Sequence, residues 1–147
     1  MIATLRSLLK NRAGVSALEF AIISPVLLTL LLGLFKFGIA MNQYMVLTNA
    51  AAKGALTLAL SRGTTTPYTS TTSAIAAAAP NLTAANITTT VTINGTACTT
   101  DSSCSSSLVA GVTAVVRTTY PCDLTVMGIN YAPSGCALSA QTAQMVQ

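Results

Sequence analysis

Few residues of this 147-residue chain can do chemistry, and the first of them is Glu19, the only formal charge in the apolar stretch 15–35. The basic residues that precede this stretch are Arg6, Lys10 and Arg12. Inserting a carboxylate deep in a membrane-spanning helix costs about 2.5–3.5 kcal/mol of free energy. An acidic residue found there therefore usually has a function. If the bond between Gly14 and Val15 were cut, the freed Val15 amine could neutralise Glu19 within one subunit or between neighbours. The pattern therefore indicates a chain that is cut and then assembled.

A second interpretation of Glu19 stays open. Four residues into a helix, its carboxylate would also complement the positive end of the helix dipole near the membrane surface, for about 0.3–1 kcal/mol. Under both interpretations of Glu19, Gly14 is a suitable cleavage residue, because a residue without a side chain can lie extended in a narrow protease cleft.

The other reactive side chains are four cysteines, all of which follow the apolar stretch. They are Cys98, Cys104, Cys122 and Cys136. In an exported segment we expect them to form disulfides. Three connectivities are open, and the local one, Cys98 with Cys104 and Cys122 with Cys136, closes loops that between them contain Gly, Ser and Pro. Zinc is the alternative, but the intervals match no zinc knuckle or ribbon and the chain has no His, so we expect neither a metal nor a cofactor.

Composition argues against catalysis and against nucleic-acid binding. After residue 35 the only acids are Asp101 and Asp123, which we interpret as turn residues, and without His the usual acid–base and triad chemistry lacks partners. We therefore expect no enzyme. Three of the seven basic residues lie in the first twelve positions, so no basic patch remains to bind phosphates.

The element that must position Glu19 is a membrane-spanning helix over 15–35. Its 21 residues suffice to cross a hydrocarbon core about 30 Å thick at 1.5 Å per residue. The basic leader should stay in the cytoplasm, which places the segment after Lys36 outside it. A secretory signal peptide cut after Ala40 is a competing interpretation, although its apolar region would be unusually long and would contain a charge. The N-terminal residue of the mature protein distinguishes the two.

Pro25 interrupts this helix, removing one backbone donor and crowding the carbonyl of Ala21. We expect a kink or a loosened turn there, with Ser24 available to satisfy the freed carbonyl.

Beyond the span, helical composition continues to Arg62, and Gly63 marks the end of the helix. We predict a leader over 1–14, a transmembrane segment over 15–35, an exposed continuation of the helix over 36–62 and an extracytoplasmic head over 63–147. The head should contain a short helix over 70–79, capped by Ser73 and stopped by Pro80, and a turn at Asn94-Gly95. Strands are expected over 86–94, 109–120 and 137–146. The fold class is therefore α+β, with a small antiparallel sheet packed on the exposed half of the long helix.

Gly14, Glu19 and Phe20, followed by Pro25 and a Leu-rich run, resemble the processing site of type IV pilin-like proteins. The resemblance is greatest to the TadE-like minor pilins, or pseudopilins, of the Tad (Flp) pilus system, and it covers residues 12–38. It implies that a prepilin peptidase cuts the Gly14–Val15 bond on the cytoplasmic side, which makes Glu19 the fifth mature residue.

The length of the mature chain and its first residue distinguish between subfamilies of type IV pilin-like proteins. Removing 14 of the 147 residues leaves 133, too many for an Flp-type major pilin, which is little more than the apolar helix. General-secretion pseudopilins and type IVa pilins usually begin the mature chain with Phe, whereas this one would begin with Val15. In pilins a proline at the depth of Pro25 lets the helix extend as subunits pack, and the resemblance implies that role here; a kink that a lipid-facing helix tolerates is the alternative.

The resemblance thus implies a structural minor pilin in pilus assembly, initiation or adhesion. Its partners would be the prepilin peptidase, other pilin or pseudopilin subunits, the inner membrane and the Tad assembly machinery, with no nucleic acid. It would lie in the inner membrane as a single span, N-terminus cytoplasmic and head periplasmic, or in a pilus on the cell surface. The alternatives are an uncleaved membrane-anchored binding module and a secreted disulfide-containing ligand protein.

Overall fold

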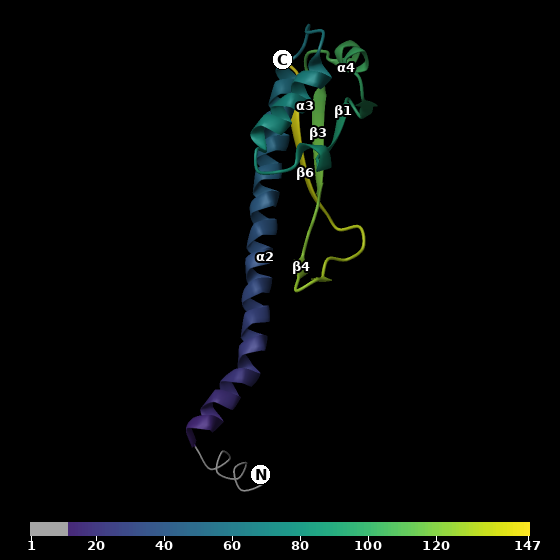
Figure 1. Cartoon of the computed structure of the whole chain (residues 1–147). Helices are drawn as coiled ribbons and strands as arrows, with labels where there is room; N and C mark the ends of the chain where they lie inside the picture. Colours follow the sequence, from purple (N-terminus) through teal and green to yellow (C-terminus); the bar gives the residue numbers. More distant parts are fainter. Residues whose placement is uncertain (1–11) are drawn as a thin grey trace. The chain divides into compact units, whose positions relative to one another are not determined.

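The computed structural model describes residues 12–147, so the leader residues Arg6 and Lys10 lie outside the described part (Figure 1). The chain divides into two compact units, which are described separately. The first comprises Met1–Gly38 and Leu124–Tyr131, and the second comprises Ile39–Asp123 and Ala132–Gln147.

One long helix, α2 (Arg12–Leu60), contributes to both units with its 49 residues. It begins three residues before the predicted span and ends two residues before the predicted end. The Ser61 N–H donates to Leu58 O at 3.0 Å and the Ser61 hydroxyl donates to Thr57 O at 2.6 Å, which closes the last turn. Gly63 then adopts a φ of +80°, which a residue with a side chain rarely does, so the predicted stop at this glycine is confirmed.

In the first unit, α2 is apolar and exposed. Among the described residues, one helix is long and apolar enough to cross a membrane, over Val15–Leu60, with a mean hydropathy of 2.2 in its most apolar window, none of which is buried. Pro25 lies inside the helix, and Figure 1 shows the helix axis bending within its purple N-terminal part. The Thr29 hydroxyl donates to the Pro25 carbonyl at 2.8 Å. The bend agrees with the kink expected from a proline in this segment.

The first unit also contains a small hairpin that the sequence analysis did not predict. Strands β4 (Thr125–Val126) and β5 (Ile129–Asn130) pair antiparallel and join no other strand. Met127 and Gly128 form the turn with φ values of 50° and 81°. Two consecutive positive φ angles are typical of the type I′ turn that matches the twist of a tight hairpin.

The second unit holds a four-stranded antiparallel sheet in the order β2-β1-β3-β6. The strands are β1 (Thr88–Ile93), β2 (Thr96–Cys98), β3 (Thr113–Pro121) and β6 (Ala137–Met145). The predicted α+β class and its small antiparallel sheet are confirmed. Asn94 and Gly95 have φ values of 50° and 80° and join β1 to β2, so the predicted turn is confirmed as well.

Two helices and one helical turn complete this unit: α3 (Pro67–Ala78), α4 (Asp101–Ser107) and the 3₁₀ turn η1 (Ala84–Asn86). Helix α3 begins earlier than predicted because Pro67, whose fixed φ suits a first helical turn, starts it after Thr66. Ser73 therefore lies inside the helix, and its predicted role as the cap was wrong. Pro80 follows the end of α3, as expected.

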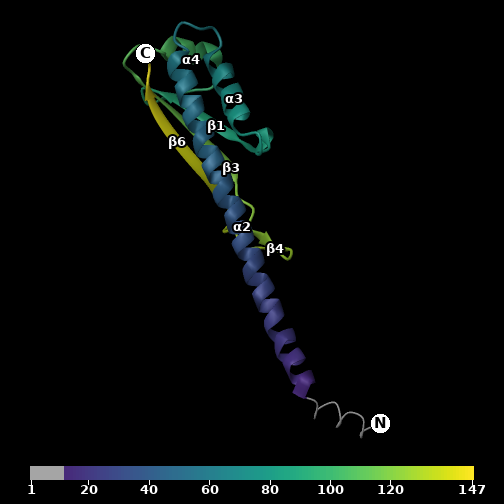
Figure 2. The ribbon, with the colours of Figure 1, turned by 90° about the vertical axis from the view of Figure 1, so that its left-hand side faces the viewer.

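The core of the second unit forms where α2 meets the sheet and α3, and the teal part of α2 runs beside them in both views (Figures 1 and 2). Leu47 and Leu58 of α2 are fully buried with Ile75 of α3 and Val91 and Val116 of the sheet. This contact confirms that the sheet packs on the helix beyond the apolar segment.

Small residues of α2 serve two purposes. Ala50, Ala51 and Ala55 are fully buried in the core of their own chain. A Cβ on Gly54 would lie 2.6 Å from Ile75 Cγ1, so this glycine permits the close approach of α2 and α3. A Cβ on Gly33 would meet nothing within 4 Å, which leaves the small residues of the first unit open to partners outside the chain.

Candidate processing and assembly site

The Gly14–Val15 bond lies within α2, close to the start of the part of the chain that the structure describes. A protease that needs an extended backbone at Gly14 would have to unwind the helix locally at this bond.

Glu19 is exposed on α2, one turn beyond Val15. Residues four apart in a helix share a face, with about 5–6 Å between their Cβ atoms. Within the described part of the chain, the Glu19 carboxylate has no hydrogen bond or ion pair. In the uncut chain the Val15 nitrogen is an amide without charge, so the expected ion pair can form only after cleavage.

The surface around Glu19 is apolar over a long distance. Soluble proteins rarely expose a contiguous apolar patch of more than a few hundred Å², so a surface of this length needs lipid or another subunit. Large apolar side chains exposed on this stretch are Val15, Leu18, Phe20, Ile22, Ile23, Val26, Leu27, Leu28, Leu30, Leu31, Leu32, Leu34, Phe35, Phe37 and Ile39. An anion at the start of such a surface would be stabilised by a cationic partner if it became buried there.

All four cysteines pair locally. Cys98 lies opposite Cys104 with 5.2 Å between their Cα atoms, and Cys122 lies opposite Cys136 with 5.6 Å. These are the pairs that the sequence favoured among the three connectivities, and the pairing leaves no cysteine free for zinc. Cys98 and Cys104 are buried in the core of the second unit, whereas Cys122 and Cys136 are only half-buried.

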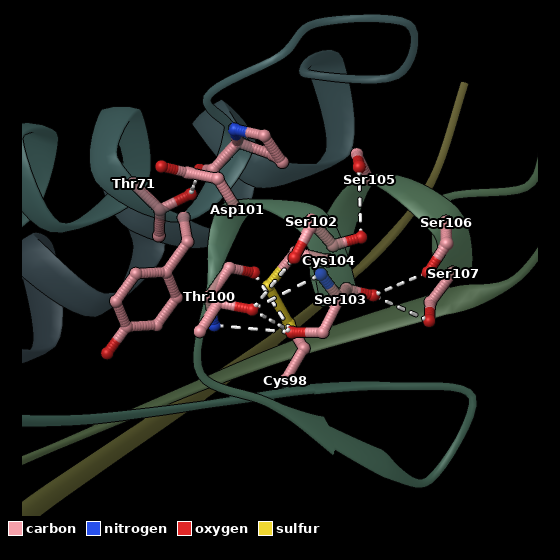
Figure 3. Close-up of a disulfide and its surroundings, with 12 residues drawn as sticks. Thr71, Cys98, Thr100, Asp101, Ser102, Ser103, Cys104, Ser105, Ser106 and Ser107 are labelled. Atoms are coloured by element: carbon pink, nitrogen blue, oxygen red, sulfur yellow. Dashed lines mark hydrogen bonds between the residues drawn. A yellow bond between two sulfur atoms is a disulfide. The ribbon is translucent and has the colours of Figure 1, made fainter.

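The Cys98–Cys104 disulfide joins the last residue of β2 to the middle of α4 (Figure 3). The Ser103 N–H donates to Thr100 Oγ1 at 3.3 Å, and the Thr100 N–H donates to Ser103 Oγ at 3.2 Å. This reciprocal pair is a capping box, which satisfies two backbone donors at the start of a helix. A hydroxyl residue at Thr100 with another three positions later, at Ser103, could have predicted the start of this short helix, which was not expected from the sequence.

Asp101 connects α4 to α3, so its interpretation as a turn residue was wrong: it is the first residue of α4. The Thr69 N–H donates to Asp101 Oδ1 at 2.9 Å and the Thr69 hydroxyl donates to Asp101 Oδ2 at 2.6 Å. The Thr69 hydroxyl is the largest cause that lowers the pKa of Asp101, followed by the Thr69 backbone, while burial acts weakly in the opposite direction. An anion here also complements the N-terminal end of α3.

A lowered pKa makes the head less stable in acid. Asp101 makes its full contribution to the free energy of unfolding above the ordinary carboxyl pKa of about 4. This contribution is lost as the pH falls through the lowered pKa of the folded state. We expect Asp101→Asn to melt below the wild-type protein at neutral pH, with a difference that shrinks below about pH 4. Thermal melts from pH 7 to pH 2 test this, and Thr69→Val, alone and combined with Asp101→Asn, shows whether Thr69 is the partner. A melting difference that is constant with pH would contradict it.

Comparison with known proteins adds one finding. The model of the family described as TadE-like protein matches residues 14–56, as the resemblance of the N-terminal residues led us to expect. The match begins at the proposed cleavage glycine and ends inside α2, so the sheet and both disulfides lie beyond it. No curated protein and no solved structure matches the chain.

Proposed function

We propose that this chain is a minor pilin-like subunit of a Tad (Flp) pilus system. A prepilin peptidase cuts it after Gly14, the mature chain waits in the inner membrane with its head in the periplasm, and α2 then carries it into a pilus or primes pilus assembly. The role is structural, and the head serves initiation or adhesion.

The observation that carries this proposal is where the family match starts. It begins at Gly14 and covers Glu19, Phe20, Pro25 and the exposed apolar surface of α2. These are the residues that a processed pilin-like helix needs, with a scissile glycine, an acid one turn later and an apolar surface for lipid or neighbouring helices. The folded head on the other half of α2 supports a subunit larger than a bare filament helix.

An uncleaved membrane-anchored binding module is the competing function. Such a module needs only an apolar membrane-spanning segment and a stable head, and the chain has both. The difference lies at Gly14, which such a module would not need.

Co-expression with a prepilin peptidase tests the proposal. The wild-type chain should lose residues 1–14, measured as intact mass and as an N-terminal Val15. Gly14→Val should block this loss, because a β-branched side chain does not fit where the protease accepts only a hydrogen.

Gly38→Val is the matched control. A Cβ at Gly38 meets nothing within 4 Å, so the same substitution in the same helix should leave cleavage intact. A wild-type chain that keeps Met1 beside an active peptidase would favour the uncleaved anchor. Cleavage of Gly14→Val at the wild-type rate would contradict the assignment of the site.

A further inference from the structure

In the first unit, the hairpin faces the apolar segment of α2 across an open cavity of about 640 Å³. Its α2 side is formed by Val26, Thr29, Leu30, Gly33, Leu34, Lys36 and Phe37, and its hairpin side by Leu124, Val126 and Tyr131. Cavities of this volume and lining bind apolar ligands.

The hairpin is uncharged and mostly apolar, with Thr125 and Asn130 as its polar residues. No charged residue occurs in 124–131, and Met127, Ile129 and Tyr131 are each more than half exposed. Neither strand of the hairpin pairs with the four-stranded sheet, so the hairpin adds nothing to that sheet. Exposed apolar side chains on a tight turn indicate a contact with something apolar outside the chain.

The extent of the cavity along α2 suggests what that contact is. From Val26 to Lys36 the helix rises about 15 Å, which equals the thickness of one leaflet in a hydrocarbon core of about 30 Å. Lys36 lies at the outer end of the cavity, where a lysine can extend its ammonium group toward lipid head groups. Tyr131 has the amphipathic ring that favours the boundary between lipid and water.

We propose that the hairpin Leu124–Tyr131 is a second membrane-contacting element, which contacts the outer leaflet of the bilayer that α2 spans and holds a lipid acyl chain against α2. This inference rests on the membrane placement in the proposed function. It goes beyond that function because it assigns a lipid contact to a part of the chain that follows the predicted span by almost ninety residues.

A hairpin can enter lipid only if its backbone groups are satisfied. Thr125 pairs with Asn130 and Val126 with Ile129, and the Tyr131 N–H donates to Leu124 O at 3.3 Å. These bonds pair only part of the hairpin's backbone, so its outer edges fit the boundary between lipid and water, where water and lipid head groups supply partners, better than the apolar core of a bilayer. The Cys122–Cys136 disulfide closes the chain just outside the hairpin and limits the conformations that its ends can adopt.

The experiment uses tryptophan fluorescence, since the chain has no native Trp. Tyr131→Trp is placed in the full-length protein, one copy per lipid nanodisc, with bromine atoms on the lipid acyl chains as quenchers. Leu30→Trp reports the α2 wall of the same cavity, and Val109→Trp, also more than half exposed but in the second unit, is the unquenched control.

We expect brominated lipid to quench Tyr131→Trp nearly as strongly as Leu30→Trp, with Val109→Trp unaffected, and Ile129→Trp to behave like Tyr131→Trp. Quenching of Leu30→Trp alone would overturn the hairpin inference and keep α2 in the membrane. No quenching of Leu30→Trp would overturn the membrane placement and the proposed function with it. The measurement is repeated with two copies of the protein per disc. If quenching of Tyr131→Trp is then lost, a second subunit occupies the cavity, and the lipid assignment is overturned.

Discussion

Glu19→Gln should insert into the membrane and be cut normally, yet fail to enter or prime filaments. The substitution keeps the size of the side chain and removes its charge, so the Val15 ammonium freed by cleavage loses its partner among packed apolar helices. A buried charge left without its partner costs about 3–5 kcal/mol. We therefore expect incorporation or pilus yield to fall on the order of a hundredfold or more.

The measurement compares sheared pili with total membrane protein by immunoblot. Lys53→Gln is the matched control, because it neutralises an exposed charge on the same helix outside the apolar segment. Normal incorporation of Glu19→Gln would refute the pairing and would favour the interpretation of Glu19 as a complement to the helix dipole.

Loss of the Cys98–Cys104 disulfide should destabilise the head more than loss of Cys122–Cys136. The loss of chain entropy in the unfolded state alone would make Cys122–Cys136 the more stabilising disulfide. By this measure the short loop contributes about 2 kcal/mol and the longer one about 3 kcal/mol. However, Cys98 and Cys104 are buried in the core, so replacing both with Ala also removes packing and frees α4. We expect about 3–5 kcal/mol for Cys98→Ala/Cys104→Ala and about 3 kcal/mol or less for Cys122→Ala/Cys136→Ala.

Denaturant unfolding of the detergent-solubilised protein, followed by circular dichroism, gives both values. Each double variant removes two cysteines and leaves the other disulfide intact, so each serves as the control for the other. A larger loss in Cys122→Ala/Cys136→Ala would show that loop closure outweighs packing in this head.

The regular elements of the head were predictable because their signals are local. Val and Thr enrichment identified β3, the Asn94-Gly95 dipeptide identified the β1–β2 turn, and Gly63 identified the end of α2. The class of the fold followed from their order along the chain, with one long apolar helix before several short strands.

The features that were missed depend on contacts between distant segments or on very short elements. Asp101 resembled a turn residue because its partner, Thr69, lies 32 positions earlier on another helix. The β4–β5 hairpin has only two paired residues in each strand, too few to show alternation, and its turn places a methionine at positive φ. The roles of Gly14 and Glu19 stay predictions, since Gly14 acts in the cut itself and the partner of Glu19 gains its charge only after the cut.

Cleavage after Gly14 should create a charged amine one helical turn from the Glu19 carboxylate. The most direct test is the N-terminal residue of the mature protein isolated from the membranes of the cells that make it. We expect this residue to be Val15. An N-terminus at Met1 would show an uncut anchor and one at Met41 a secreted protein, and either would contradict it.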